Sequence, residues 1–221
     1  MVQTYSQPTT RQDEWVINRL DGKRGGVYVE IGAHDGVRHS NTKMLEEHYG
    51  WTGLLVEPQF PLYVECIRNR NPQQDDKINQ LSQCVIGRDT GEEIFFLKGG
   101  SYGGISEFMP GDWKQEHQRR RTHGDYRKTH SLKWLLHHHE MPGWIDYLSL
   151  DVEGAELPIL EGYYSLKERE IVRGEFGIIT VEFRYDDVLL ARLEELLAPQ
   201  YTLENVEAFD AFFVNRRLTR A

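Results

Sequence analysis

One stretch near the start of the chain limits the fold more than any other, because the run VYVEI at 27–31 leads directly into the glycine turn GAHDG at 32–36. A mostly apolar, β-branched run before such a turn predicts a buried strand that ends at a sharp bend. The next segment carries Met44 and Leu45 on one face and is closed by Gly50, which predicts a helix. Strand, turn and helix together direct backbone N–H groups at one point, which suits an anionic group.

An acidic residue lies inside this strand, two positions before the first glycine of the turn. The pattern Glu30-x-Gly32-x-x-x-Gly36 differs from G-x-G-x-x-G, so the dinucleotide fingerprint is absent and a nucleotide-dependent dehydrogenase or epimerase is disfavoured. We expect Glu30 to face a positive or hydroxyl-rich part of a ligand. A ligand that carries a carboxylate and an ammonium group together, as an amino acid does, would suit both the N–H groups of the turn and the acidic Glu30.

Three further apolar runs end in a carboxylate, at Glu57, Asp151 and Glu182. In open α/β sheets, an acid at the end of the second strand commonly binds ribose hydroxyls, and we expect this role of Glu57. A nucleoside joined to an amino acid makes S-adenosylmethionine. If the strands are parallel, these three acids and Glu30 lie at one edge of the sheet. The alternative, that each acid only caps the helix after it, explains any one of them better than all four.

Three motifs carry a resemblance to a known family: VEIGAHDG at 29–36, LLVEP at 54–58 and above all IDYLSLDVEGAELPILEG at 145–162. They resemble the FkbM-type group of S-adenosylmethionine-dependent methyltransferases, and the likeness covers roughly residues 27–215. One departure is His34, where the family more often has Asn. The resemblance implies an α/β Rossmann-like class I methyltransferase fold, with a mostly parallel seven-stranded sheet, helices on both faces and an antiparallel C-terminal strand pair. It also implies methylation of a hydroxyl, often on a sugar, a glycan or a secondary metabolite.

The cofactor, S-adenosylmethionine, is expected to contact the glycine turn, the start of the following helix and the ends of the next strands. The candidates are Glu30, Gly32, Ala33, His34, Asp35, Gly36, Asn41, Glu57, Pro58, Cys84 and Asp151. Cys84 is placed beside the adenine only by its position in the fold. The alternative that we favour for Cys84 is a small buried core residue, which is the usual place of a free cysteine.

Methyl transfer from a sulfonium is an in-line displacement, so positioning does most of the catalytic work. A hydroxyl acceptor has a high pKa, and its proton must be removed by a general base or with the help of a metal ion. We expect Asp151 to be central, with Glu153 or Glu182 as its partner, because crowded carboxylates raise the pKa of one another. His34 is a further candidate base, although its place on the turn favours a ligand contact. Asp151 and Glu182 also offer the oxygen ligands that a divalent metal such as Mg2+ prefers.

Residues 98–130 are expected to form a lid-like insertion. The segment from Lys98 to Ser106 contains four glycines in nine residues, and an irregular stretch follows it to about Lys128. Long loops in compact domains are often lids or acceptor-binding segments, and a plain surface loop is the alternative. Aromatic rings stack on sugar faces, so Trp113 points toward acceptor binding. The candidate acceptor-binding residues are Tyr102, Ser106 and Glu156.

Two runs of like residues have mainly structural interpretations. The basic run RRR at 119–121 is typical of a solvated helix face, and the functional alternative is recognition of a phosphate or carboxylate on the acceptor. The run HHH at 137–139 does not predict a metal site, because consecutive helical residues point about 100° apart and cannot share one ion.

The remaining elements follow from periodicity and turn residues. We expect residues 1–26 to form an arm and a helix capped by Thr9 or Thr10, and residues 27–221 to form one methyltransferase domain. Further helices are expected at 60–69, 131–140, from 155 or 156 to 162, and at 187–197. A strand at 78–86 with a break near 82–83 is expected to pair as a hairpin with a strand at 92–97, and strands at 201–206 and 211–215 are expected to close the sheet.

Composition limits the partners and the compartment. The net charge of −9 argues against a phosphate-binding track for nucleic acid and against a basic membrane patch. The polar first ten residues predict no signal peptide, and two cysteines predict no disulfide framework, so a reducing cytoplasm is expected. The partner expected is a small-molecule or glycan acceptor, with a homodimer left open. An N-methyltransferase of small molecules and a non-catalytic cofactor-binding module are the alternative functions.

Overall fold

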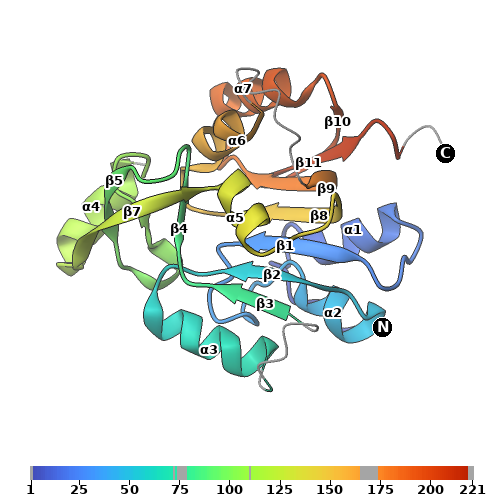
Figure 1. Ribbon diagram of the computed structural model, residues 1–221. Coiled ribbons are helices and arrows are strands. Elements are labelled where there is room, and N and C mark those ends of the chain that lie inside the picture. Colours follow the sequence, from blue (N-terminus) through green and yellow to red (C-terminus); the bar gives the residue numbers. More distant parts are fainter. Residues whose placement is uncertain (1, 72, 74–78, 110, 165–173, 219–221) are drawn as a thin grey trace.

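The computed structural model describes residues 2–71, 73, 79–109, 111–164 and 174–218 (Figure 1). Its core is a seven-stranded sheet with the strand order β10-β11-β9-β8-β1-β2-β3. These strands are β1 (Val27–Ile31), β2 (Thr52–Val56), β3 (Asn79–Ser82), β8 (Trp144–Leu150), β9 (Glu175–Glu182), β10 (Tyr201–Glu207) and β11 (Asp210–Asn215).

Most neighbouring strands run parallel, and the exception lies at the C-terminal edge. β1 pairs in parallel with β2 and β8, while β2 pairs in parallel with β3 and β8 with β9. β11 is antiparallel to both of its neighbours, β9 and β10. The predicted mostly parallel seven-stranded sheet with an antiparallel C-terminal strand pair is therefore confirmed.

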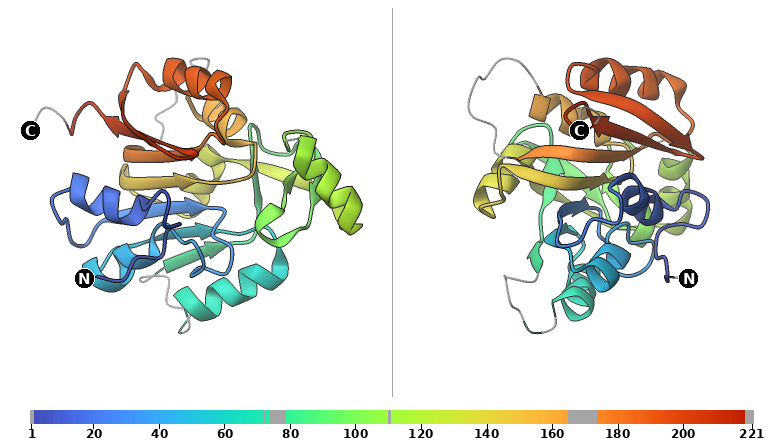
Figure 2. Two further views of the ribbon diagram at one scale, coloured as in Figure 1. Left: turned by 180° about the vertical axis from the view of Figure 1, so that it is seen from behind. Right: turned by 90° about the vertical axis from the view of Figure 1, so that its right-hand side faces the viewer.

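Helices cover both faces of this sheet, as predicted (Figures 1 and 2). Successive side chains of β1 point to opposite faces: Tyr28 packs in one apolar cluster, and Val29 and Ile31 pack in another. The first cluster includes residues of α1 (Gln12–Arg19), α2 (Lys43–Tyr49) and α3 (Phe60–Arg70). The second includes residues of α5 (Leu132–His138), α6 (Glu156–Tyr164) and α7 (Asp187–Leu197).

A second, smaller sheet of four strands has the order β4-β7-β5-β6. Its strands are β4 (Val85–Gly87), β5 (Glu93–Leu97), β6 (Gly104–Ile105) and β7 (Gly124–Ser131). The expected hairpin between the strand at 78–86 and the one at 92–97 is wrong, because β5 pairs with β6 and β7 instead. The expected break near 82–83 is real: β3 ends at Ser82 in the large sheet and β4 begins at Val85 in the small one.

The stretch to Lys128 is not irregular, which corrects the sequence-based expectation. It contains helix α4 (Gly111–Arg120) and most of β7, and the glycine-rich segment before it contains the short helix η1 (Gly100–Tyr102). α4 and the outer parts of β5 and β7 lie beyond the ends toward which the β1, β2 and β3 arrows point (Figures 1 and 2). The insertion therefore stands over the carboxyl edge of the large sheet, where an open α/β sheet binds its ligands.

Helix termini agree with the prediction in most places. Ser131 caps α5 through its Oγ, which accepts a hydrogen bond from Trp134 N, and Gly50 ends α2 in the left-handed conformation with φ 68°. The expected cap of the first helix is wrong. Arg11, not Thr9 or Thr10, precedes α1, and it has φ 44° and no side-chain cap hydrogen bond.

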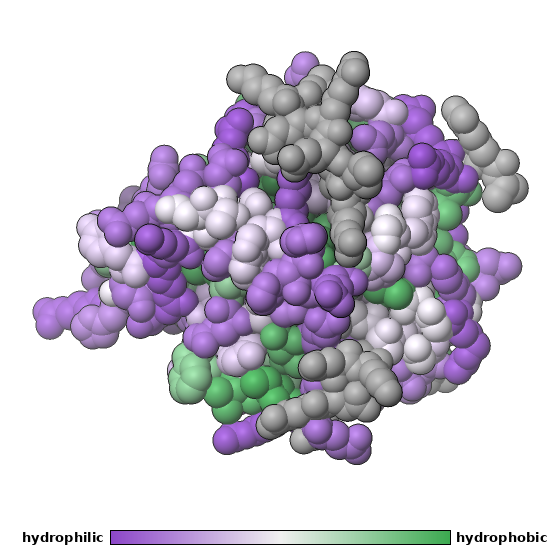
Figure 3. All heavy atoms as spheres, viewed as in Figure 1, coloured by the Kyte–Doolittle hydropathy of each residue, from purple (hydrophilic) through white to green (hydrophobic). Residues whose placement is uncertain are grey.

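The face of the molecule in Figure 3 is mostly hydrophilic, with a hydrophobic area over α3. Phe60 at the start of α3 is 62% exposed. Within the described residues, no helix has the length and apolar character needed to cross a bilayer.

Candidate active site

The site is centred on the carboxyl ends of β1 and β8, which lie side by side. β2 and β3 lie on one side of β1, and β8 and the later strands lie on the other, so the strand order reverses at this point. Open α/β sheets bind their ligands where the order reverses. Asp151 N donates to Ile31 O at 3.1 Å, which brings the loop after β8 against the glycine turn. Gly32 has φ 93°, and a Cβ on it would lie 1.8 Å from Asp151 O. Only glycine fits there, so the turn and Asp151 are held together by backbone contact.

Two adjoining cavities open at this edge of the sheet. The smaller has a volume of about 120 Å³, and the predicted cofactor residues in its wall are Gly32, His34, Glu57, Pro58, Cys84 and Asp151. The larger has a volume of about 1520 Å³ and lies between the large sheet and the insertion. His34, Asp151 and Glu153 line both cavities, so they stand at the boundary between the two spaces.

Glu57 follows β2 and is 5% exposed. Its Oε2 accepts a hydrogen bond from His34 N at 3.1 Å, and its Oε1 accepts one from Gln59 N at 2.7 Å. Burial raises the pKa of Glu57 to about 7, although both amide hydrogen bonds favour its charged form. Each oxygen keeps a further lone pair, so the carboxylate can still accept hydrogen bonds from a ligand in the smaller cavity.

His34 lies on the turn in the left-handed conformation, with φ 51°. Its Nε2 lies 3.4 Å from Ser101 Oγ in the insertion, and its Nδ1 lies 3.6 Å from Asp35 Oδ1. A non-glycine residue at positive φ is strained, and such strain is often found at functional sites. The ring thus connects the glycine turn to the insertion at the border of the two cavities.

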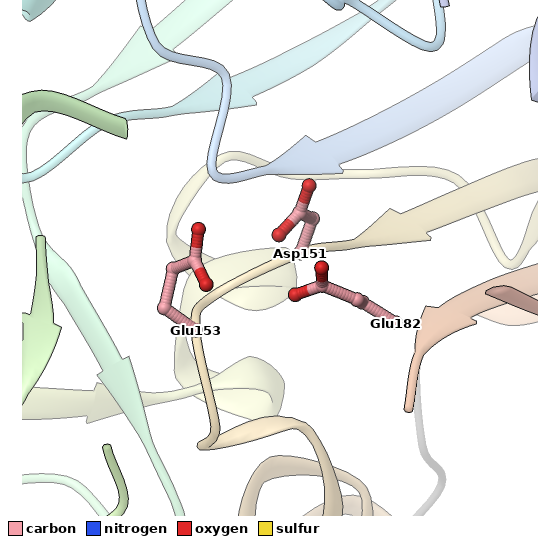
Figure 4. Close-up of side chains that lie close together, drawn as sticks. All are labelled: Asp151, Glu153 and Glu182. Atoms are coloured by element: carbon pink, nitrogen blue, oxygen red, sulfur yellow. The ribbon is translucent and has the colours of Figure 1, made fainter. Parts of the chain in front are cut away.

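Three carboxylates gather at this border. Asp151 and Glu153 come from the loop after β8 and Glu182 from the end of β9, and their side chains point toward one another (Figure 4). One oxygen of each lies within 4.8 Å of the others. Burial first, and mutual repulsion second, raise the pKa values of Asp151 and Glu153 well above their usual range. Burial raises the pKa of Glu182 to about 7.

Arg184 supplies positive charge to this cluster. Its Nη2 lies 2.6 Å from Glu153 Oε2, and its Nε lies 3.1 Å from Glu182 Oε2. Its guanidinium carbon also lies 3.5 Å from the centre of the Trp113 ring in the insertion. In the described part of the chain, the three acids form the one group whose oxygen ligands suit a hard cation. Arg184 already occupies two of the carboxylate oxygens there, and the Mg2+ site stays a prediction.

Glu30 differs from the expectation that it faces a ligand. Its side chain points to the face of the sheet opposite Ile31, and it lines neither cavity. Glu30 accepts hydrogen bonds from Ser40 Oγ at 3.1 Å, Asn41 N at 2.8 Å and Thr42 Oγ1 at 2.5 Å. The fully buried Arg70 lies 3.5 Å away. The expectation that four acids lie at one edge and face the ligand is therefore wrong for Glu30 and holds for the other three. Glu30 instead stabilises the segment that leads into α2.

Four other predicted cofactor residues also lie behind the cavity wall. The Asn41 amide donates to Ser149 Oγ at 3.0 Å, and Ala33 is buried in the core. Asp35 Oδ1 accepts hydrogen bonds from the backbone of the turn, at Val37 N and Arg38 N. A Cβ on Gly36, which has φ 78°, would meet Arg70 and Cys66. In this arrangement they shape the turn, and their contact with the cofactor remains a prediction.

The predicted acceptor-binding residues divide between the larger cavity and its surroundings. Tyr102 lines the cavity and packs edge-on against Trp113, with ring centres 4.5 Å apart. Glu156 also lines it, but its two oxygens accept from Val152 N and Gly154 N, both at 2.9 Å, so it shapes the loop that carries Glu153. Ser106 is outside the lining of both cavities.

The two runs of like residues behave largely as expected. Arg119 and Arg120 both pair with Glu116 on α4, and Arg120 also lies over the Tyr102 ring and lines the larger cavity. Recognition of an anionic acceptor by this run stays untested. His138 stacks on Trp134, with ring centres 4.5 Å apart, which gives one histidine of the 137–139 run a packing role.

Sequence reasoning did not identify two residues that shape the site, Arg184 and Gln59. Arg184 follows the acidic strand end by two positions, and a charge of the opposite sign there was the signal available. Gln59 connects the end of β2 to the insertion, as its amide bonds to Gly99 and Gly100 show. No local pattern indicates a contact between residues so far apart in the chain.

The sequence matches the family model of the methyltransferase FkbM domain over residues 30–204. This chain belongs to the FkbM methyltransferase family. The resemblance carried by the glycine turn and by the IDYLSLDVEGAE motif is therefore confirmed. As an FkbM member the chain is an S-adenosylmethionine-dependent methyltransferase, with the cofactor that the family uses. A comparison of this FkbM sequence with curated proteins found no match.

Solved methyltransferases share the fold of this FkbM chain. A Staphylococcus aureus structure described as a caffeoyl-CoA O-methyltransferase superposes with a TM-score of 0.50 and 11% identity, covering 97% of this chain and 86% of that one. A Pyrococcus horikoshii structure described as an RNA methyltransferase gives 0.48 and 10%, covering 97% and 87%. A precorrin-6y C5,15-methyltransferase from Geobacter metallireducens gives 0.46 and 12%, covering 91% and 84%. At 11% identity, the likeness to the Staphylococcus aureus structure concerns the fold alone. Together with the strand order of the large sheet, it confirms the class I methyltransferase architecture.

Proposed function

We propose that this FkbM methyltransferase transfers the methyl group of S-adenosylmethionine to a hydroxyl group of a sugar, a glycan or a secondary metabolite. One observation carries the proposal: Asp151 and Glu153 line both cavities, and the Glu182 carboxylate adjoins them. A donor in the smaller cavity would therefore meet an acceptor from the larger one beside three carboxylates. A hydroxyl acceptor needs such a group to take its proton.

The smaller cavity is the place proposed for the nucleoside part of the cofactor. Glu57 lies at the end of β2, where an acid commonly binds the ribose hydroxyls in open α/β sheets. Pro58 and Cys84 line the same cavity and would border the adenine, and Gly32 gives the backbone close access. With the nucleoside bound in this way, the sulfonium would face Asp151 at the border with the larger cavity.

The reaction proposed is an in-line displacement. The acceptor oxygen attacks the methyl carbon as the carbon–sulfur bond breaks, and the electron pair of that bond stays on sulfur in the neutral product S-adenosylhomocysteine. The acceptor proton passes to a carboxylate of the cluster. Asp151 and Glu182 are the proposed proton acceptors, with Glu153 held by Arg184 as their neighbour. His34 keeps its role as an alternative base because it lines both cavities.

The lining of the larger cavity supports a hydroxyl-rich acceptor. Aromatic side chains of Tyr102, Trp113 and Tyr185 lie in its wall together with many carboxylates. Aromatic faces pack on the apolar faces of sugar rings, and carboxylates accept hydrogen bonds from sugar hydroxyls. The net charge of −9 disfavours nucleic acid and anionic membranes as partners. Cys66 and Cys84 are both free thiols, in agreement with the cytoplasm that we propose as the compartment.

Turnover with a panel of acceptors tests the proposal. The protein is incubated with methyl-labelled S-adenosylmethionine and either polyols and sugars or small amines, and formation of S-adenosylhomocysteine is measured with and without EDTA. Methylated hydroxyl products that disappear in Asp151→Asn support the proposal. Products on amines only would favour the N-methyltransferase alternative. Cofactor binding without turnover on any acceptor would favour a non-catalytic module. Loss of turnover with EDTA would support a divalent metal ion at the carboxylates.

A further inference from the structure

The smaller cavity has a roof that belongs to the insertion. We use the name roof loop for residues 99–103, which include η1 and precede β6. Gly100, Ser101 and Gly103 of this loop line the smaller cavity together with the residues at the end of β2. The insertion therefore covers the space proposed for the nucleoside as well as the acceptor cavity.

Several side chains hold the roof loop. His117 Nε2 lies 2.6 Å from Tyr102 O, and His34 Nε2 lies 3.4 Å from Ser101 Oγ. The largest number of these hydrogen bonds, however, comes from Gln59. Its Oε1 accepts hydrogen bonds from Gly99 N at 3.1 Å and Gly100 N at 3.0 Å, and its Nε2 donates to Gly100 O at 2.8 Å. The loop also packs tightly on this amide, because a Cβ on Gly103 would lie 2.6 Å from Gln59 Nε2. Gln59 is only 8% exposed, so these hydrogen bonds are shielded from water.

The same residue touches the group proposed to bind ribose. Gln59 N donates to Glu57 Oε1 at 2.7 Å, while the Gln59 side chain reaches the roof loop. Pro58 between them accepts a hydrogen bond from Arg127 Nη1 on β7, at 2.6 Å. A three-residue segment at the end of β2 thus joins the floor of the smaller cavity to the insertion above it.

The small volume of this cavity indicates that the roof loop moves when the nucleoside binds. Sites for drug-sized ligands and cofactors commonly measure roughly 300–1,000 Å³. With the roof loop in place, the smaller cavity measures about 120 Å³. More room for a nucleoside is gained when the loop lifts away from the end of β2, and lifting the loop breaks the bonds to Gln59.

We propose that Gln59 is a positioning residue that closes the roof loop over the bound cofactor and sets the rate of cofactor exchange. The inference rests on the proposed cofactor site. Glu57 holds the cofactor and Gln59 fixes the loop above it, so the backbone bond between them couples cofactor binding to loop closure. Gln59 touches none of the reacting atoms, and it acts on binding and release rather than on the chemical step.

The test compares Gln59→Ala with Gln59→Glu and with the matched control Gln80→Ala. Gln59→Glu keeps an oxygen that accepts from the roof loop and loses the donor to Gly100 O. Gln80 is also a bridging glutamine, with Nε2 donating to His139 O at 3.2 Å, but it lines neither cavity. Dissociation of S-adenosylhomocysteine is followed by stopped-flow fluorescence, and amide exchange of residues 99–103 by hydrogen–deuterium exchange.

Gln59→Ala is expected to speed dissociation about 10- to 100-fold, since three hydrogen bonds are lost. Amide exchange at 99–103 rises with it, while the acceptor KM and the thermal midpoint stay near those of the wild type. The dissociation rate and amide exchange of Gln59→Glu are expected to lie between those of the wild type and Gln59→Ala, and Gln80→Ala is expected to behave as the wild type. Unchanged dissociation and unchanged exchange in Gln59→Ala overturn the inference. A wild-type protein that binds neither S-adenosylmethionine nor S-adenosylhomocysteine overturns the proposed function itself.

Discussion

The Arg184 guanidinium carbon lies 3.5 Å from the centre of the Trp113 indole ring. Arg184 follows β9 in the large sheet, and Trp113 belongs to α4 in the insertion. The same guanidinium bonds to Glu153 and Glu182, so a stacked cation connects the insertion to the carboxylate cluster. The position of α4 and the charge state of the proposed catalytic acids are therefore linked through one side chain.

Replacement of Arg184 by Met is expected to move the pH dependence of catalysis. The guanidinium lowers the pKa values of Glu153 and Glu182, so its removal raises them, and the carboxylates lose charge at a higher pH. Burial raises the pKa values of Asp151, Glu153 and Glu182, so the acidic limb of kcat/KM for S-adenosylmethionine is expected at neutral pH or above in the wild type. It should shift upward by about one pH unit in Arg184→Met, and by less in Arg184→Lys.

The control for this shift is Arg19→Met. Arg19 also pairs with a carboxylate, Glu204, at 2.6 Å, but the pair lines neither cavity. Its loss should leave the profile in place. An acidic limb that stays at the wild-type pH in Arg184→Met would show that neither Glu153 nor Glu182 titrates in the reaction.

Glu57→Gln is expected to weaken cofactor binding about 10- to 100-fold, because a charged acceptor for the ribose hydroxyls is replaced by a neutral one. S-adenosylmethionine and S-adenosylhomocysteine share the ribose, so both should lose the same factor in calorimetric titrations. The rate at saturating cofactor should change little, and Glu204→Gln serves as the control. A variant that binds normally and turns over slowly would contradict the ribose assignment.

The large sheet could be predicted from sequence because most of its strands, β1, β2, β8, β9 and β11, are largely apolar runs with sharp ends. The insertion could not. β7 has the sequence GDYRKTHS, and only Thr129 in it is buried. α4 has the sequence GDWKQEHQRR, and only His117 is buried. Segments with so little apolar surface lack the periodicity that reveals strands and helices, and long-range pairing with β5 fixes β7 instead.

The topology of a parallel sheet predicts which edge forms the site. It did not lead us to the face of the sheet to which Glu30 points. Parallel strands place their carboxyl ends together, which brought Glu57, Asp151 and Glu182 to one rim. Glu30 lies one residue before the end of β1, and alternation turns it to the other face. There it meets Arg70, a residue of α3 that nothing in the local sequence connects to the strand.

Gly32→Ala is expected to destabilise the fold by about 2–4 kcal/mol, through positive-φ strain and collision with the backbone of Asp151. A Cβ there would lie 1.8 Å from Asp151 O at φ 93°. Gly50→Ala separates the two causes, because Gly50 has φ 68° and nothing within 4 Å of a Cβ. It should lose only about 1 kcal/mol. Thermal unfolding measures both, and equal losses would mean that the contact with Asp151 does not matter.

Asp151 should couple cofactor binding to proton release. Burial and the neighbouring Glu182 raise its pKa well above the usual range, so the free protein holds this carboxyl protonated up to a higher pH than an ordinary aspartate. A sulfonium placed beside it favours the carboxylate and expels the proton, whereas the neutral sulfur of S-adenosylhomocysteine does not. Affinity for S-adenosylmethionine therefore rises with pH, by up to about tenfold per pH unit, and affinity for the product does not follow it.

Calorimetric titration in two buffers of different ionisation enthalpy measures this proton release directly. S-adenosylmethionine should release more protons than S-adenosylhomocysteine in the wild type. Asp151→Asn removes the titrating group, so the difference between the two ligands should vanish, and turnover should fall about 100-fold or more for want of a base. If the sulfonium binds next to Asp151, the two ligands must release different numbers of protons. Equal proton release by both ligands in the wild type would mean that the sulfonium lies elsewhere.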